Sequence, residues 1–363
     1  MTMRGLRRNF RSRSITVSGR RVRTTPVFDA YWYFAAARQS IFFDRLYKRN
    51  RSPAREADPI LSGYRFTNAY RASDRVSQYL IRHVLRGEDD ADSQFLRVLL
   101  FKIFNKIETW EAIAESVGDV TAANFPLEAI EQVLDRRQDT NLRNYSAAYI
   151  MPSVGRKFFT TRKHAGHLRL IRWLLNEGAP RRIYGAKTMV GAYEALLSIP
   201  SFGPFLAYQY ATDLNYGHWT DFSEMEFVKA GPGALDGIAK CFEPGHDLSS
   251  EQIIEFMAVN QYSFFEQLNL DFADLWGRPL QLIDCQNLFC EISKYSRVAF
   301  PDIPGENGRT RIKQRYESGG ASPLPMPLYP QKWGINASVL PKPRFAEPLR
   351  RDPSASSPQL DLV

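Results

Sequence analysis

Residues 188–221 read TMVGAYEALLSIPSFGPFLAYQYATDLNYGHWTD, and this stretch decides the fold of the chain. Apolar residues recur at helical spacing up to Leu197, and a second helical pattern runs from Pro204 to Tyr216. Proline is favourable at the first position of a helix, because its missing N–H would have no helical partner. Gly203, just before it, lets another chain approach closely. The stretch therefore predicts two helices joined by a tight turn.

The same helical spacing of apolar residues extends through most of the chain. It predicts further helices over residues 28–47, 74–85, 95–107, 127–134, 167–175, 250–265 and 280–298. No series of alternating β-branched strands appears, which argues against a parallel sheet. We therefore expect an all-α fold.

Composition and charge limit the class of protein. Hydrophobic residues make up 44% of the 363 residues, which is typical of a globular chain, and the formal net charge of +9 favours a polyanionic partner. Three cysteines cannot form a disulfide framework, so a reducing compartment fits best. No apolar run is long enough for a membrane helix, so we expect no membrane partner. The expected location is cytoplasmic, nucleoid-associated or nuclear depending on the host.

The two ends of the chain differ in composition from its body. Residues 1–26 are expected to form a basic flexible arm able to condense on phosphate backbones, or else a solubilising tail. Its arginines are Arg4, Arg7, Arg8, Arg11, Arg13, Arg20, Arg21 and Arg23. Residues 27–316 are expected to form one helical domain. The Pro- and Ser-rich residues 317–363 are expected to be largely disordered, with Tyr329 and Trp333 pinning part of the tail to the domain surface.

The turn Ile199-Pro200-Ser201-Phe202-Gly203 resembles the helix-hairpin-helix of DNA-binding proteins. In that motif, exposed N–H groups at the start of the second helix contact a DNA phosphate, aided by the helix dipole. Ser201 stands where the pattern has its first glycine, and Gly203 supplies the second. The alternative is an ordinary packing corner between two helices.

The resemblance to helix-hairpin-helix DNA glycosylases also implies a catalytic aspartate after the second helix. Asp221 lies close to that spacing, and Asp213, within the second helix, is the competing candidate. Such a carboxylate could orient a nucleophile or stabilise charge on a flipped nucleotide. The alternative for Asp221 is an N-cap of a helix starting at Phe222.

Three further stretches narrow the resemblance. They are Tyr-Arg-Phe-Thr-Asn-Ala-Tyr-Arg at 64–71 followed by Asp74-Arg75, Val-Lys-Ala-Gly-Pro-Gly-Ala at 228–234, and Gln286-Asn287 with Cys290-Glu291 and Lys294-Tyr295. In this order they resemble the alpha-glutamyl/putrescinyl thymine pyrophosphorylase family, which includes the helical domain of 5-hydroxymethyluracil DNA kinases. The resemblance implies a fold related to the glycosylases and a part in thymine hypermodification of DNA.

The matched residues suggest two kinds of contact with DNA. Arg65, Arg71 and Arg75 suit phosphate oxygens, while Phe66 and Tyr70 suit base stacking. The alternative is a helical corner in which these arginines pair with Asp74.

Two more groups of matched residues have both a functional and a structural interpretation. Gly231-Pro232-Gly233, flanked by Lys229, is expected to be a loop with unusual dihedral angles that presents backbone N–H groups to a phosphate, or a simple turn. Glu291 could complete a carboxylate pair for catalysis, with Lys294 as a phosphate ligand; alternatively, the two form an ion pair on a helix face.

Three functions remain open. The first is an enzyme that acts on a flipped 5-hydroxymethyluracil-derived base and transfers a group at its 5-methylene. The others are a DNA base glycosylase and a non-catalytic targeting partner of a separate kinase. No Gly-x-x-x-x-Gly-Lys-Ser/Thr loop is present, so a nucleotide site would come from a separate P-loop kinase. No cofactor or structural metal is expected, and a nucleotide or amino-acid co-substrate stays open.

Overall fold

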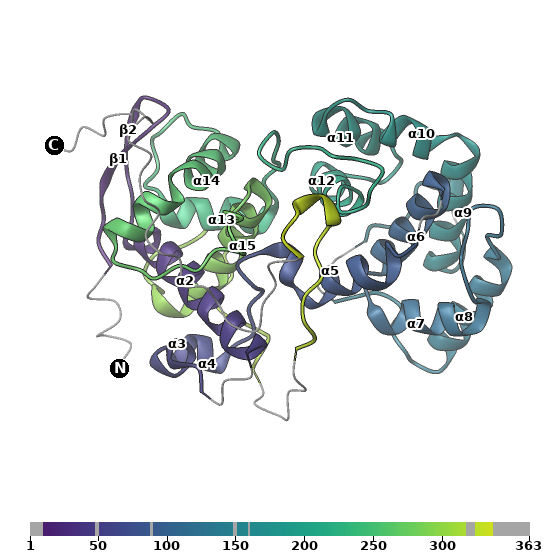
Figure 1. Ribbon diagram of the computed structural model, residues 1–363, viewed down its shortest axis with the longest axis horizontal. Helices are drawn as coiled ribbons and strands as arrows, with labels where there is room; N and C mark the ends of the chain where they lie inside the picture. The colour runs from purple at the N-terminus through teal and green to yellow at the C-terminus, as the bar shows by residue number, and fades with distance from the viewer. Residues whose placement is uncertain are drawn as a thin grey trace. The chain divides into compact units, whose positions relative to one another are not determined.

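The computed structural model describes residues 10–47, 51–87, 90–147, 151–158, 160–316 and 324–336 (Figure 1). These residues are predominantly helical, as predicted, and among them the only β-sheet has two strands. The chain divides into two compact units. Unit 1 contains Met1–Asp74, Val228–Pro327 and Ile335–Val363, and unit 2 contains Arg75–Phe227 and Leu328–Gly334. The single domain predicted over residues 27–316 is thus divided between both units.

Unit 1 is built around α2. Its elements are β1 (Ser14–Val17), β2 (Arg20–Arg23), α2 (Pro26–Leu46), α3 (Pro53–Ala57), α4 (Pro59–Gly63), the 3-10 turn η1 (Arg71–Ser73), α13 (Pro232–Cys241), α14 (Ser250–Gln267) and α15 (Leu282–Ala299). Thr25 caps α2 by accepting a hydrogen bond from Val27 N at 3.1 Å. Trp32 stacks on Phe264 of α14, with 5.3 Å between ring centroids, and Phe28 meets the same ring edge-on. Aromatic packing therefore joins α2 to α14.

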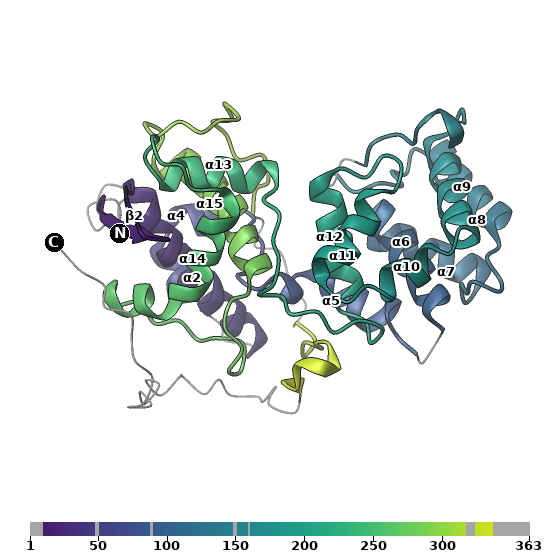
Figure 2. The same ribbon diagram turned by 90° about the horizontal axis from the view of Figure 1, so that it is seen from above.

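Helices α13 and α15 lie side by side (Figures 1 and 2) because two glycines allow it. A Cβ at Gly237 would lie 2.0 Å from the carbonyl oxygen of Phe289, and one at Gly233 would lie 3.1 Å from Cys290 Sγ. The loop predicted for Gly231-Pro232-Gly233 is therefore wrong in its geometry. Pro232 begins α13, Gly231 is its N-cap with φ −88°, and the glycines serve helix packing.

The sequence 14–23 forms a β-hairpin, where a flexible arm was expected. Strands β1 and β2 pair antiparallel, with Ser14 opposite Arg23 and Val17 opposite Arg20. Ser18 (φ 49°) and Gly19 (φ 76°) form the two-residue turn, and both have the positive φ that suits a tight hairpin. The Ser-Gly dipeptide between two short runs was the missed signal. Residues 1–9 of the predicted arm lie outside the described residues.

Unit 2 contains the other helices. They are α5 (Arg75–Tyr79), the π-turn η2 (Leu80–Val84), α6 (Ala91–Phe104), α7 (Ile107–Val117), α8 (Leu127–Asp139), η3 (Arg156–Phe158), α9 (Lys163–Asn176), α10 (Ala179–Tyr184), α11 (Met189–Leu197), α12 (Pro204–Leu214) and η4 (Gln331–Trp333). Nearly every residue of α6 is buried, and it contacts α7, α9, α10 and α12. This explains the unbroken apolar run at 98–101, since a central helix is apolar on all sides.

Part of the proline-rich tail packs on unit 2. Tyr329 is 1% exposed and stacks on Trp333, whose ring meets Tyr216 edge-on at 5.8 Å. Gln78 holds the backbone N and O of Leu328 with two hydrogen bonds, at 2.9 and 3.0 Å. The two aromatic residues thus anchor residues 328–334, while 317–323 and 337–363 lie outside the described residues. Within the described part of the chain, no helix is both long and apolar enough to cross a membrane.

Candidate functional site

In unit 2, α11 and α12 are joined by a tight turn at 198–203. Ile199 and Phe202 are buried and hold the turn against the unit, while Gly203 and Pro204 are exposed. Gly203 is the N-cap of α12, with φ −86° and ψ 170°, and as a glycine it has no side chain that could cap the first turn. The positive end of the α12 dipole therefore lies at an exposed turn whose capping residue contributes no side chain.

Ser201 adopts the backbone conformation of the glycine that it replaces. Its φ is +71°, in the left-handed region that favours glycine. The serine therefore does not distort the turn, but its Cβ makes this conformation unfavourable by about 1 kcal/mol. The local geometry of the turn is that of two helices around a hairpin, and the helix-hairpin-helix assignment stays a prediction.

The segment 215–222 after α12 is a closed loop held by Asn215. Asn215 Oδ1 accepts hydrogen bonds from Thr220 Oγ1 and Phe222 N, both at 3.0 Å, and Asn215 Nδ2 donates to Phe222 O at 3.0 Å. Lys332, from the tail, donates to the carbonyl oxygens of Gly217 (3.2 Å) and Thr220 (2.5 Å) and to Asn215 Oδ1 (3.2 Å). The side chains of Asn215 and Lys332 thus hold the loop in place through these hydrogen bonds.

Asp221 projects from this fixed loop into solvent. Its carboxylate is exposed and, among the described residues, has no hydrogen-bond or ion-pair partner. No helix begins at Phe222, because 222–231 is irregular backbone, so the N-cap interpretation is wrong. Trp219, two residues earlier, is 40% exposed, and its ring neighbours His218 at 5.0 Å. The loop therefore presents a carboxylate and an aromatic face together.

Asp213, the competing aspartate, lies in the interior of unit 2. It is 1% exposed, and its Oδ2 is 2.8 Å from Nζ of Lys102 on α6, whose side chain is 7% exposed. A buried carboxylate needs such a partner, because an isolated buried charge is very costly. The pair joins α12 to α6, and of the two candidate aspartates only Asp221 is accessible.

In unit 1, the segment 66–68 lies on a buried polar cluster. Arg38 of α2 donates to the backbone oxygens of Thr67 (2.9 Å) and Phe66 (3.2 Å) and to Asn68 Oδ1 (3.2 Å). Burial lowers the pKa of Arg38 to about 10, so the guanidinium stays charged at neutral pH. Asp74 Oδ1 accepts from Asn68 N at 2.7 Å. The segment is thus fixed by charged groups from two sides.

Glu291 and Asp74 are the carboxylates of this cluster. Glu291 is 2% exposed, accepts from Thr67 N at 3.1 Å, and forms an ion pair with Lys294. The helix-face pair expected for Glu291 and Lys294 is therefore present. Burial raises the pKa of the Asp74 carboxyl to about 7, with Glu291 adding to the rise and the bond from Asn68 opposing it. Asp74 was considered only as a structural partner of the arginines.

The predicted phosphate and stacking residues differ in burial and in their contacts. Arg65 is exposed, Arg71 is buried to 6% with its N–H on Asp284, and Arg75 belongs to unit 2, where it approaches Glu108 at 4.0 Å. Tyr70 is 1% exposed and donates its hydroxyl to the carbonyl of Arg278, so its ring is core and the stacking prediction is wrong for it. Phe66 packs on Phe34 and Tyr295.

The predicted anion residues before α13 have other contacts. Lys229 Nζ forms an ion pair with Glu251 at 3.0 Å, which partly neutralises its charge. Gly231 remains at an N-terminus without a side-chain cap, while Gly233 faces α15. Sequence reasoning missed Trp219, Asn215, Lys332 and Arg38. Trp219 lies two residues before Asp221, and this closeness could have indicated a role at the site. The composition of the tail gave no indication of a role for Lys332.

Comparison with known proteins supplies the family. A family model described as "5-hmdU DNA kinase, helical domain" matches residues 25–305. The chain belongs to this family. A curated relative, the 5-hmdU DNA kinase of Bacillus phage SP10, is 25% identical over 287 residues. The match covers 74% of this chain and 45% of the relative, so the chain spans less than half of that protein. No solved structure matches the chain.

Proposed function

We propose that this protein binds DNA and acts on a flipped base derived from 5-hydroxymethyluracil, in group transfer at the 5-methylene. The observation that carries the proposal is the Asp221 carboxylate, exposed and without a partner among the described residues, on a loop fixed by Asn215 and Lys332. A charged group on a rigid loop is already positioned for a substrate, so little ordering entropy is lost on binding. Membership of the 5-hmdU DNA kinase helical-domain family supports the substrate class.

The proposed chemistry of Asp221 is that of a general base. The carboxylate accepts the proton of the nucleophile as the new bond forms, and the leaving group departs with the electrons of the bond that breaks. In phosphorylation, the nucleophile is the 5-hydroxymethyl oxygen and the leaving group comes from a nucleotide co-substrate. Trp219, on the same loop, offers a ring face on which an extruded base can stack.

The start of α12 is proposed to position the DNA. Gly203 and Pro204 are exposed, and Gly203, the N-cap, has no side chain that could cap the helix. A phosphate there would gain both N–H donors and the favourable end of the helix dipole. Such a contact fixes the register of the duplex without reading its sequence.

A second candidate function is a non-catalytic targeting partner of a separate P-loop kinase. The observation in its favour is that the matching family model describes a helical domain, and no P-loop motif occurs in this chain. In this case unit 2 would bind the modified DNA, and the partner would bring the nucleotide. Asp221 would then contribute to binding and not to chemistry.

The test is mass spectrometry of nucleosides from oligonucleotides that contain thymine, 5-hydroxymethyluracil or its phosphorylated form. Each is incubated with the protein, with and without ATP and amino acids. We expect a mass change confined to a 5-modified base, and its loss in Asp221→Asn with DNA binding intact. Asp119→Asn is the matched control, because Asp119 is a highly exposed aspartate of unit 2 paired with Arg86. The control should keep full product formation.

The other outcomes separate the alternatives. An abasic product would identify a glycosylase. Tight DNA binding without any product would favour the targeting partner, and loss of binding in Asp221→Asn would place the carboxylate in recognition. Absence of DNA binding by the unaltered protein would refute the proposal.

A further inference from the structure

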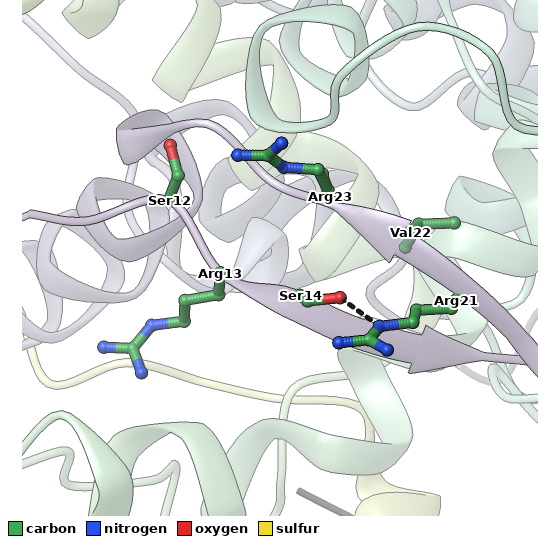
Figure 3. Close-up of a pocket in the computed structure, with 6 residues that line it drawn as sticks. All are labelled: Ser12, Arg13, Ser14, Arg21, Val22 and Arg23. Atoms are coloured by element: carbon green, nitrogen blue, oxygen red, sulfur yellow. Dashed lines mark hydrogen bonds between the residues drawn. The ribbon is translucent and has the colours of Figure 1, made fainter. Parts of the chain in front are cut away.

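An extruded base needs an aromatic face on which it can stack and polar groups that reach its edge. In unit 1, the open pocket at the root of the β1–β2 hairpin (Figure 3) is lined by Ser12, Arg13, Ser14, Arg21, Val22 and Arg23. These lining residues include no aromatic ring. In unit 2, the loop 215–222 carries the exposed ring of Trp219, and the exposed side chain of His218 comes directly before it. Recognition of a base therefore fits this loop better than the pocket.

His218 is held in place by a buried side chain of α6. Gln94 is 0% exposed, and its Nε2 lies 3.2 Å from Nδ1 of His218. The amide is closely packed, because a Cβ at Gly217 would lie 2.1 Å from Gln94 Oε1. Glycine at this position therefore leaves room for the amide beside the loop. The contact with α6 adds to the hydrogen bonds that Asn215 and Lys332 make with the same loop.

The contact with Gln94 decides which nitrogen of the imidazole can donate. The nitrogen of a side-chain amide is a donor only, so Nδ1 of His218 accepts from it. A neutral imidazole carries one proton, which in this arrangement is on Nε2. Among the described residues, His218 has no second hydrogen-bond partner. Its exposed side chain therefore offers one N–H donor, at Nε2, to a ligand.

This donor lies beside the ring that is proposed for stacking. The ring centroids of His218 and Trp219 are 5.0 Å apart, and their planes are tilted by 39°. Tyr184 of α10 supports the indole from another side, with 6.4 Å between the centroids. A base stacked on Trp219 lies about 3.5 Å from the indole, so its edge comes within reach of the neighbouring imidazole. Asp221 follows Trp219 by two residues on the same loop.

We propose that His218 determines specificity for uracil-type bases by donating its Nε2–H to O4 of the extruded base. Position 4 carries an acceptor oxygen in thymine and other uracil-type bases, whereas cytosine has an amino group there, which donates. A fixed N–H donor bonds the oxygen and opposes the amino group, so it both favours the first base and disfavours the second. Position 4 is next to position 5, where Asp221 is proposed to act. One loop thus reads the base and acts on its substituent.

This inference rests on the proposed function, because it requires an extruded base at the loop 215–222. It goes beyond that function by assigning the residue that separates uracil-type from cytosine-type bases. Gln94 is the positioning residue, since it contacts the imidazole and fixes its donor. The role of His218 is a hydrogen bond in recognition, and the proton transfer stays with Asp221.

The test compares 5-hydroxymethyluracil with 5-hydroxymethylcytosine, which have the same 5-substituent and opposite hydrogen-bonding groups at position 4. Each base is placed opposite an abasic site in the same duplex sequence, so that neither loses a pairing partner on extrusion. Fluorescence anisotropy gives the two dissociation constants for the full chain, and nucleoside mass spectrometry gives the product. In His218→Phe, the preference for 5-hydroxymethyluracil should fall about 10-fold, because phenylalanine neither bonds O4 nor opposes the amino group.

His83→Phe is the matched control. His83 is also an exposed histidine of unit 2, and its ring lies beside that of Tyr79, with 4.6 Å between centroids and a tilt of 39°. This variant makes the same chemical change beside another aromatic ring and should keep the preference of the unaltered protein.

A second measurement does not depend on any variant being active. Nitrogen–proton NMR correlations of the full chain with isotope-labelled histidine, recorded at about pH 8.5 so that imidazoles are neutral, locate the ring proton. The His218 signals are identified by their loss in His218→Phe. We expect the proton on Nε2, and a proton on Nδ1 would overturn the proposal.

The binding results separate this proposal from the proposed function. Equal binding of the two bases by the unaltered protein would overturn the role of His218, and so would an unchanged preference in a His218→Phe variant with a native melting curve. The proposed function stands in both cases if product forms on 5-hydroxymethyluracil. A preference that falls in His218→Phe without product from any protein would retain the role in recognition and refute the proposed catalysis. If the unaltered protein binds no DNA, both proposals fail.

Discussion

Removal of Lys102 tests whether Asp213 is structural. In Lys102→Met, the Asp213 carboxylate, 1% exposed, loses the ammonium that lies 2.8 Å away. Breaking a buried pair from one side costs about 3–5 kcal/mol, because the remaining charge stays desolvated. For a unit of this size, 1 kcal/mol corresponds to about 2–4 °C, so the melting temperature of unit 2 should fall by about 10 °C. Hydrogen exchange of the α12 amides, read by mass spectrometry, localises the loss.

The double variant Lys102→Met/Asp213→Leu completes the cycle. It replaces the pair with apolar groups of similar volume, and the free energy of unfolding should return to within about 1 kcal/mol of the unaltered protein. Nucleoside product should also be retained, since the proposed chemistry uses Asp221. A double variant that is stable but forms no product would refute the structural assignment of Asp213. A loss below about 1 kcal/mol in Lys102→Met would show that the carboxylate does not depend on the ammonium.

Two further predictions concern Asp74 and Ser201. The pKa of Asp74 is raised to about 7, so between pH 4 and 7 the unfolded chain has lost a proton that the folded chain keeps. The free energy of unfolding should therefore fall as pH rises through this window, by on the order of 4 kcal/mol relative to the Asp74→Asn variant. Above pH 8 the difference between the two proteins should be constant. Parallel urea titrations that show no such pH dependence would contradict the pKa shift. Ser201→Gly should raise the free energy of unfolding by about 1 kcal/mol, because glycine has no Cβ penalty at φ +71°. A destabilised glycine variant in thermal melts would show that the serine side chain makes a compensating contact.

Local pattern was enough to predict most of the longer helices. The helical period predicted 188–197 and 204–216, and the structure has Met189–Leu197 and Pro204–Leu214. A capping box begins α14: Ser249 Oγ accepts from Gln252 N at 3.1 Å, and Ser249 N donates to Gln252 Oε1 at 2.9 Å, so this helix start depends only on residues three apart. Helix α13 was missed, because Gly231-Pro232-Gly233 at its start is typical of a turn in the sequence.

The candidate site was only partly predictable. The position of Asp221 after two predicted helices identified it as a candidate. The sequence did not show that Asp221 caps no helix, because this depends on the irregular backbone of 222–231. The sequence could not separate Asp221 from Asp213, because both are aspartates near the end of one helix. Burial against Lys102, more than 100 residues earlier, separates them.

The sequence by itself determined the helical class, the family and the basic character of the chain, because periodicity, motifs and charge are properties of neighbouring residues. Only the tertiary structure decided which polar residues meet. Lys332 reaches the Asp221 loop from the tail, and Glu291 reaches the backbone of Thr67 across more than 200 residues. Such contacts depend on how apolar faces pack, and packing brings together side chains whose separation along the chain carries no signal.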